Sequence, residues 1–175
     1  MVSAKINQYI ENSKINGKLC RWGKSVINVF ITEMTLQGVN NTFLYSQMQQ
    51  AILLWNNILL KNGINIRFEH INVPTNADII VHWVKVGRVF EGMCKYPSII
   101  NGYFKKIFID IGLSNEFSPK NVTEKSIFAT MLHEFGHSIG LGHGVEIDDV
   151  MFVPHQKNVE IPSENDIYVL KYIYQ

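Results

Sequence analysis

Residues 133–143 read His-Glu-Phe-Gly-His-Ser-Ile-Gly-Leu-Gly-His, and this stretch decides how the chain is interpreted. It has the form H-E-x-x-H-x-x-G-x-x-H, which supplies three imidazoles for one metal ion and a carboxylate beside them. A catalytic zinc takes three protein ligands and keeps its fourth position for water. The stretch therefore predicts a catalytic zinc site.

The apolar residues between Ser126 and Ile139 recur at helical spacing, which predicts a helix over this range. His133 and His137 are four residues apart, so both imidazoles lie on one face, one turn apart, and can reach the same zinc ion. Glu134 is next in the sequence and projects about 100° round the helix. We therefore expect its carboxylate to lie beside the metal rather than on it.

The third histidine requires this helix to end before it. Gly140 has no Cβ and suits the left-handed conformation that terminates many helices, so the chain can turn back and bring His143 to the metal. Zinc lowers the pKa of its bound water from 15.7 to roughly 7. The predicted reaction is hydrolysis of an amide bond, with Glu134 as general base and then general acid. The alternative is a non-catalytic zinc-binding interaction module. Glu134 argues against it, because a structural site needs no carboxylate there.

A second segment, Asp149-Val150-Met151-Phe152, follows the third histidine after a short loop. With the zinc motif, it resembles the Met-turn of the metzincin metallopeptidases, and the resemblance places Met151 beneath the zinc as an apolar floor. The rest of the chain is most similar to the matrixin branch, the matrix-metallopeptidase-like group. That likeness spans Arg21 to Tyr174 and covers a first strand at 22–31, a long helix at 45–61, a third strand at 77–81 and a C-terminal helix at 163–174.

The chain also departs from the usual matrixin pattern. Gly144 stands where matrixins place serine, and no histidine lies between Val84 and Tyr103, so the family's second zinc site is not expected. No cysteine-switch propeptide is visible, and proline comes three residues after Met151 rather than two. These departures favour a minimal, bacterial-type catalytic domain with one Zn²⁺. A structural Ca²⁺ ion stays open. We expect one catalytic domain over residues 1–175, with 1–20 as an N-terminal extension.

The remaining patterns predict an α+β fold, and the resemblance implies that this fold is of the metzincin type. It implies a twisted, mostly parallel sheet of about five strands with two long helices, the zinc-motif helix, the Met-turn and a C-terminal helix. Ser163 and Asp166 resemble a capping box that opens this last helix. Apolar alternation or β-branched runs predict strands at 25–32, 64–68, 79–86 and 104–111, and polar stretches predict loops at 33–42 and 115–121.

Two further segments are candidates for binding substrate. Gly92 to Pro97 is interpreted either as an edge strand or as a surface loop, and by resemblance the strand would pair with an extended peptide. The residues that follow the Met-turn would form one wall of the pocket for the side chain after the scissile bond. The substrate-binding candidates are Met93, Cys94, Lys95, Val153, Pro154 and His155.

Histidine, cysteine and tyrosine side chains outside the zinc motif are not expected to bind the metal. His70 and His82 have no ligand-like neighbours and are expected to be packed or surface histidines. Cys20 and Cys94 are expected to be free thiols, although one disulfide stays open. The candidates for assisting the oxyanion are Tyr96, Tyr103 and Tyr168.

Composition excludes several classes of protein. The chain has 175 residues, of which 46% are hydrophobic, and a formal net charge of +1, so nucleic acid is not an expected partner. No apolar run approaches the ~18 residues of a membrane span. We expect a monomer that acts on protein or peptide. The start, Met1 to Asn7, has no signal-peptide pattern. A cytoplasmic location, with a dedicated intracellular target, therefore stays open beside the secreted or cell-surface location that the resemblance implies.

Overall fold

The computed structural model describes residues 3–33, 41–84, 92–112, 124–154 and 159–175. Five strands form one mixed sheet in the order β4-β3-β5-β7-β6. Three neighbouring pairs are parallel, and only β6 runs antiparallel to its neighbour β7. The predicted α+β fold with a mostly parallel sheet is confirmed. The strands are β3 (Val26–Ile31), β4 (Arg67–His70), β5 (Ile79–Val84), β6 (Gly92–Ile100) and β7 (Tyr103–Gly112).

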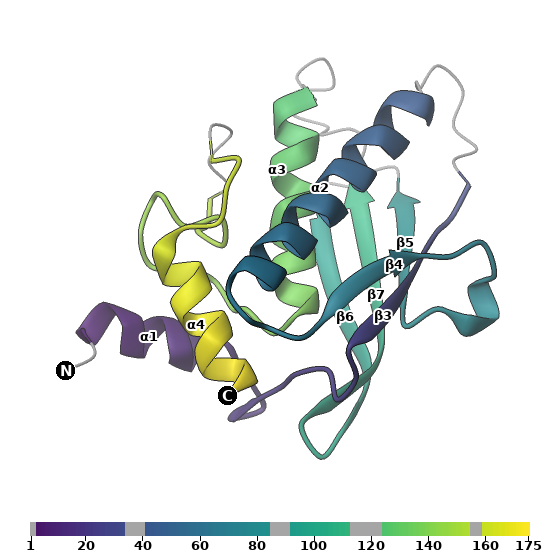
Figure 1. The fold of residues 1–175 in the computed structure, drawn as a ribbon. Helices are drawn as coiled ribbons and strands as arrows, with labels where there is room; N and C mark the ends of the chain where they lie inside the picture. The colour runs from purple at the N-terminus through teal and green to yellow at the C-terminus, as the bar shows by residue number, and fades with distance from the viewer. Residues whose placement is uncertain (1–2, 34–40, 85–91, 113–123, 155–158) are drawn as a thin grey trace.

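Two long helices, α2 (Asn41–Lys61) and α3 (Glu124–Ser138), pack against each other and against the sheet (Figure 1). Trp55 of α2 is fully buried, and its indole N–H donates to the carbonyl of Leu132 in α3 at 3.0 Å. Phe135 of α3 meets Phe68 of β4 edge-on, with ring centroids 5.0 Å apart. These contacts fix the zinc-motif helix against the core.

The C-terminal helix α4 (Glu164–Tyr174) begins as predicted. Ser163 Oγ accepts from the backbone N–H of Asp166, and the Asp166 side chain accepts from the backbone N–H of Ser163. This is the capping box, which satisfies N–H groups that have no partner within the helix. A short 3₁₀ helix, η1, spans Pro74–Asn76.

Some predicted boundaries were wrong. The strand expected at 64–68 begins only at Arg67, where β4 starts to pair with β3. Ile64 and Ile66 are buried without being in a strand, so their alternation reported burial rather than pairing. Helix α2 begins at Asn41, before the apolar pattern becomes regular. The ranges 34–40, 85–91 and 113–123 lie outside the described residues, and with them the predicted loop at 115–121 and the end of the strand expected at 79–86.

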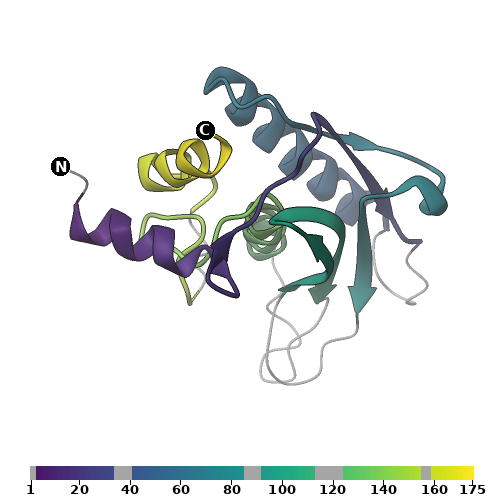
Figure 2. The same ribbon diagram turned by 90° about the horizontal axis from the view of Figure 1, so that it is seen from below.

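The first residues form α1 (Ala4–Asn12) and a small hairpin of β1 (Lys14–Ile15) and β2 (Lys18–Leu19). The side chain of Ser3 caps α1 by accepting from the N–H of Ile6. Tyr9 and Ile10 are buried in the same core as the rest of the chain. In Figures 1 and 2, α1 lies beside α4. The segment expected as an extension is therefore packed onto the domain.

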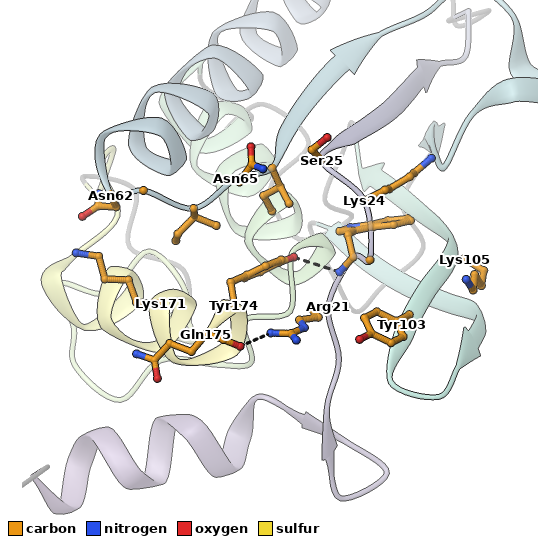
Figure 3. Close-up of a pocket in the computed structure, with 15 residues that line it drawn as sticks. Arg21, Lys24, Ser25, Asn62, Asn65, Tyr103, Lys105, Lys171, Tyr174 and Gln175 are labelled. Carbon is orange, nitrogen blue, oxygen red and sulfur yellow. Dashed lines mark hydrogen bonds between the residues drawn. The ribbon is translucent and has the colours of Figure 1, made fainter.

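The chain then passes along α4 at one wall of an open cleft of about 1050 Å³, shown in Figure 3. Arg21 donates to the backbone oxygens of Ile173 at 3.0 Å and Gln175 at 2.7 Å, while the N–H of Trp22 donates to Tyr174 Oη at 3.4 Å. None of the three motif histidines lines this cleft. These hydrogen bonds join the segment that precedes β3 to the last helix.

Within the described part of the chain, no helix has both the length and the apolar character needed to cross a membrane.

Candidate metal centre

Helix α3 carries the first two motif histidines. His133 is buried and His137 is half-buried, and their ring centroids are 4.6 Å apart, which agrees with side chains one turn apart on one helical face. His133 Nδ1 is 3.0 Å from the carbonyl oxygen of Val150, and His137 Nδ1 is 2.8 Å from that of Leu141. Metal-binding histidines characteristically use their second ring nitrogen in this way. These contacts leave Nε2 of both rings available to a metal ion.

The helix ends at Gly140 in the left-handed conformation, as predicted. Gly140 has φ +104°, its N–H donates to His137 at 3.0 Å, and the N–H of Leu141 donates to Gly136 at 3.1 Å. These two bonds form a Schellman motif, which satisfies the last carbonyls of a helix and reverses the chain. A Cβ at Gly140 would lie 2.5 Å from the carbonyl oxygen of Cys20, so only glycine fits here.

The reversal brings His143 to the other two histidines. Its ring centroid is 5.6 Å from that of His133 and 5.1 Å from that of His137. One nitrogen from each of the three rings lies within 4.8 Å of the others, which is a spacing that could hold one metal ion. Partial burial lowers the pKa of His143 and so favours the neutral imidazole, the form that binds metal. The donor set, with two ring orientations fixed by backbone carbonyls, fits zinc.

Met151 lies against the zinc-motif helix. Its side chain is fully buried, and a Cβ at Gly136 would lie only 2.3 Å from Met151 Sδ and 3.3 Å from the Trp55 ring. The backbone of Met151 also accepts from the N–H of Gly144 at 2.7 Å, which ties the loop after His143 to the turn. Gly144 has no side chain, and this lets the loop approach Asp149 closely. A Cβ at position 144 would lie only 2.6 Å from the Cβ of Asp149.

Two buried aspartates hold the turn from the other side. Asp149 accepts from the N–H groups of Val145 and Glu146 at 2.9 and 2.8 Å, and from Ser163 Oγ at 2.6 Å. It therefore closes the loop that leads from the third histidine to the turn and links it to the start of α4. The sequence pattern assigned no role to Asp149.

Asp166 is fully buried and reaches three parts of the molecule. Its carboxylate accepts from the N–H of Val150 in the turn at 2.9 Å, from the N–H of Ser163 at 2.8 Å and from Tyr9 Oη at 2.5 Å. Burial raises the pKa of Tyr9 well above its usual value, so its hydroxyl stays protonated and donates. The capping-box pattern predicted the contact with Ser163, whereas the contacts with α1 and the turn depend on the tertiary fold.

Glu134 is buried beside the histidines, with a relative exposure of 3%. Its carboxylate accepts a hydrogen bond from the backbone N–H of Cys94 in β6. Among the described residues nothing hydrogen-bonds Oε2. Burial raises the pKa of Glu134 to about 8, the N–H of Cys94 opposes the rise, and the Asp110 carboxylate adds to it. A buried polar atom without a partner is unusual, and a catalytic role or a bound water is among the physical reasons for one.

The segment at 92–97 is an edge strand rather than a loop, and it continues to Ile100. Gly92 lies directly over Glu134, because a Cβ there would be 2.6 Å from both Cγ and Oε1 of the glutamate. Met93 and Cys94 are half-buried, and burial raises the pKa of the Cys94 thiol well above its usual value. Lys95 is exposed and pairs with Asp110 of β7.

Three residues after the Met-turn are the candidates for one wall of the substrate pocket, and two of them lie within the described residues. Val153 and Pro154 are exposed and follow directly after the turn at Met151. His155 lies outside the described residues.

One of the remaining predicted side chains, Tyr96, hydrogen-bonds the backbone of a motif histidine. His70 contacts Tyr45 Oη at 2.7 Å, and His82 Nδ1 lies 3.5 Å from Asp110, in agreement with packed or surface roles. Cys20 and Cys94 are free thiols. Tyr96 Oη donates to the His137 carbonyl at 3.2 Å, whereas Tyr103 lines the cleft of Figure 3 and Tyr168 is 43% exposed on α4.

The mixed sheet, the helices that cover it and the histidine cluster beside a methionine turn define a zinc metallopeptidase domain of the metzincin type. Residues 21–175 match the family described as Matrixin, and the chain belongs to that family. This confirms the resemblance seen in the sequence. No curated protein matches the chain. The match begins at Arg21, so α1 and the β1–β2 hairpin lie before it.

Proposed function

We propose that this protein is a zinc-dependent endopeptidase in which His133, His137 and His143 bind the ion and Glu134 is the general base. The observation that carries the proposal is the buried carboxylate of Glu134, which lies next to three converging imidazoles and whose Oε2 has no partner among the described residues. Membership of the matrixin family supports zinc as the metal and a peptide bond as the target.

A zinc ion held by the three imidazoles supplies Lewis acidity, which lowers the pKa of water and polarises a carbonyl group. The remaining work is done by the chain's own groups. The N–H of Cys94 holds one oxygen of Glu134, so that Oε2 takes a proton from the attacking water. The same oxygen then gives the proton to the leaving amine, as general acid–base catalysis requires.

Substrate placement follows from the edge strand. β6 is the last strand of the sheet, and its N-terminal half passes over Glu134. An extended peptide that adds to this edge gains main-chain hydrogen bonds, while pockets between alternate side chains provide selectivity. We propose that Met93, Cys94 and Lys95 contact such a peptide. Because matrixins are typically secreted, we place the substrates among proteins outside the cell.

The test of this function is metal removal. Protein purified without chelators is expected to contain one zinc per chain by elemental analysis. It should cleave a denatured generic protein, and a strong chelator should abolish the cleavage because three neutral imidazoles lose their ion. Adding back one equivalent of zinc should restore it. Absence of zinc in the fresh protein would overturn the proposal, and zinc without any cleavage across a broad peptide library would favour the non-catalytic binding module.

A second expectation concerns the side chain that follows the scissile bond. Val153 and Pro154, which leave the turn at Met151, are proposed to form one wall of its pocket together with His155. The wall is mostly apolar, so leucine or methionine should be preferred over aspartate or lysine. One methylene in such a pocket is worth ~1–3 kcal/mol, so the preference should be graded. Profiling with a peptide library measures it, and a dominant preference for charged residues would remove these residues from the pocket.

A further inference from the structure

The segment before the family match contacts the loop that carries the third histidine. Residues 3–20 precede the matched region, yet Tyr9, Ile10 and Ser13 are buried. Figures 1 and 2 both show α1 next to α4 and to the green-yellow loop that follows α3. The contact joins residues about 130 positions apart in the sequence, and Asn12 and Ser13 at the end of α1 make it.

Two hydrogen bonds bracket His143. Ser13 Oγ accepts from the N–H of Gly142 at 2.9 Å, and Asn12 Nδ2 donates to the carbonyl of His143, also at 2.9 Å. Both side chains are themselves oriented by α1. Ser13 Oγ donates to the carbonyl of Tyr9 at 2.9 Å, and Asn12 Oδ1 accepts from Gln8 at 2.9 Å. The backbone on each side of the third histidine is therefore fixed from the N-terminal segment.

The two backbones also touch. A Cβ at Gly142 would lie 2.0 Å from the carbonyl oxygen of Asn12, so any larger residue would separate the loop from α1. Position 142 is one that the zinc motif leaves unspecified, and here the end of α1 requires glycine. Farther along the loop, Glu146 forms an ion pair with Lys5 of α1.

This support matters because His143 is held differently from the other two histidines. His133 and His137 sit on a regular helix, and a backbone carbonyl contacts the Nδ1 atom of each ring. In the described ranges no carbonyl contacts the ring of His143, which is exposed and lies in a loop. Its position therefore depends on its backbone.

We propose that residues 3–20 brace the third zinc ligand, with Asn12 and Ser13 as positioning residues for His143. The N-terminal segment is then a part of the metal centre and not an appendage to it. The inference rests on the proposed function only in taking the three histidines as the zinc ligands.

The experiment compares the zinc dissociation constants of the 175-residue parent and of the Asn12→Ala/Ser13→Ala variant, by competition with a chromogenic chelator. Loss of groups that orient metal ligands typically weakens binding 10–100-fold, and we expect a rise in Kd in that range. Glu11→Ala is the matched control, because Glu11 is exposed at the same end of the helix and forms an ion pair with Lys14. The control should keep the parental Kd.

Thermal unfolding with and without zinc separates positioning from general stability. A brace that only stabilises the fold would lower the unfolding temperatures of both forms equally, whereas a positioning role reduces the shift that zinc produces. Asn12→Asp is the second variant. Its side chain is exposed, it keeps the acceptor for Gln8, and it loses the donor for the His143 carbonyl. We expect it to fold and to bind zinc more weakly.

A Kd within twofold of the parent in both variants would overturn the proposal. Because no peptide is involved, this result is distinct from failure of the proposed function. A parent that binds zinc tightly but cleaves nothing would contradict the peptidase assignment while the brace is still decided by the Kd values.

Discussion

Replacing Glu134 with alanine should lower kcat/KM by about 10²–10⁴-fold while zinc content and fold stay at parental levels. Loss of a positioned acid–base group typically has an effect of this size. The carboxylate is not one of the three grouped nitrogen ligands, and its Oε2 has no partner among the described residues, so its removal leaves the histidines in place. Steady-state kinetics on a peptide substrate and elemental analysis measure the two quantities. A variant as active as the parent would show that Glu134 is not the base.

A companion variant separates the position of the carboxylate from its chemistry. A Cβ at Gly92 would lie 2.6 Å from Glu134 Cγ and Oε1 and 2.8 Å from Thr130 Cγ2, so Gly92→Ala should displace an intact carboxylate. Misplacement of a reacting group by about 1 Å can cost 10²-fold in rate. We expect kcat to fall by up to about that factor with zinc content unchanged. Parental kcat would mean that β6 does not set the position of Glu134.

Replacing Asp166 with alanine should greatly lower the free energy of unfolding. The variant leaves the N–H of Val150 and the hydroxyl of Tyr9 without their acceptor, and both residues are buried. Each orphaned group costs about 1–3 kcal/mol, so the free energy of unfolding should fall by roughly 2–6 kcal/mol. Denaturant unfolding followed by fluorescence measures it. Glu164→Ala in the same first turn is the control, and it should change stability by about 0.5 kcal/mol or less because Glu164 is exposed.

A double-mutant cycle identifies the partner that matters most. If the bond to Tyr9 carries much of the effect, Tyr9→Phe and Asp166→Ala should be strongly non-additive, because both remove the same contact. Additive changes would contradict a functional link between α1 and α4. A loss below about 1 kcal/mol for Asp166→Ala would contradict the account of the buried network.

The parts of the site that local sequence determines could be predicted. Helical spacing placed His133 and His137 on one face, and the helix ends at Gly140 through the expected left-handed residue. The capping box at Ser163 was equally readable. Each of these signals lies within a few residues of the feature it specifies, so no knowledge of the tertiary fold is needed.

Features that depend on distant partners could not be predicted. Ile64 and Ile66 alternate like strand residues, but pairing begins only where β3 is within reach, at Arg67. Ser13 has no local sign of contact with the zinc loop, because its partner lies 129 positions away. The family likeness begins at Arg21, so the sequence predicts only an N-terminal extension before it. Its burial follows from the packing of Tyr9 against Asp166, which no periodicity reveals.

The bond between Tyr9 and Asp166 has a consequence for how the protein is made. Synthesis runs from the N-terminus to the C-terminus, so α1 emerges before the histidine motif and Asp166 emerges after it. A nascent chain that has just exposed His143 already contains the three proposed zinc ligands and Glu134. It still lacks the aspartate that holds the methionine turn and anchors α1. Under the proposed function, activity should therefore arise only after α4 has been synthesised and has docked against α1.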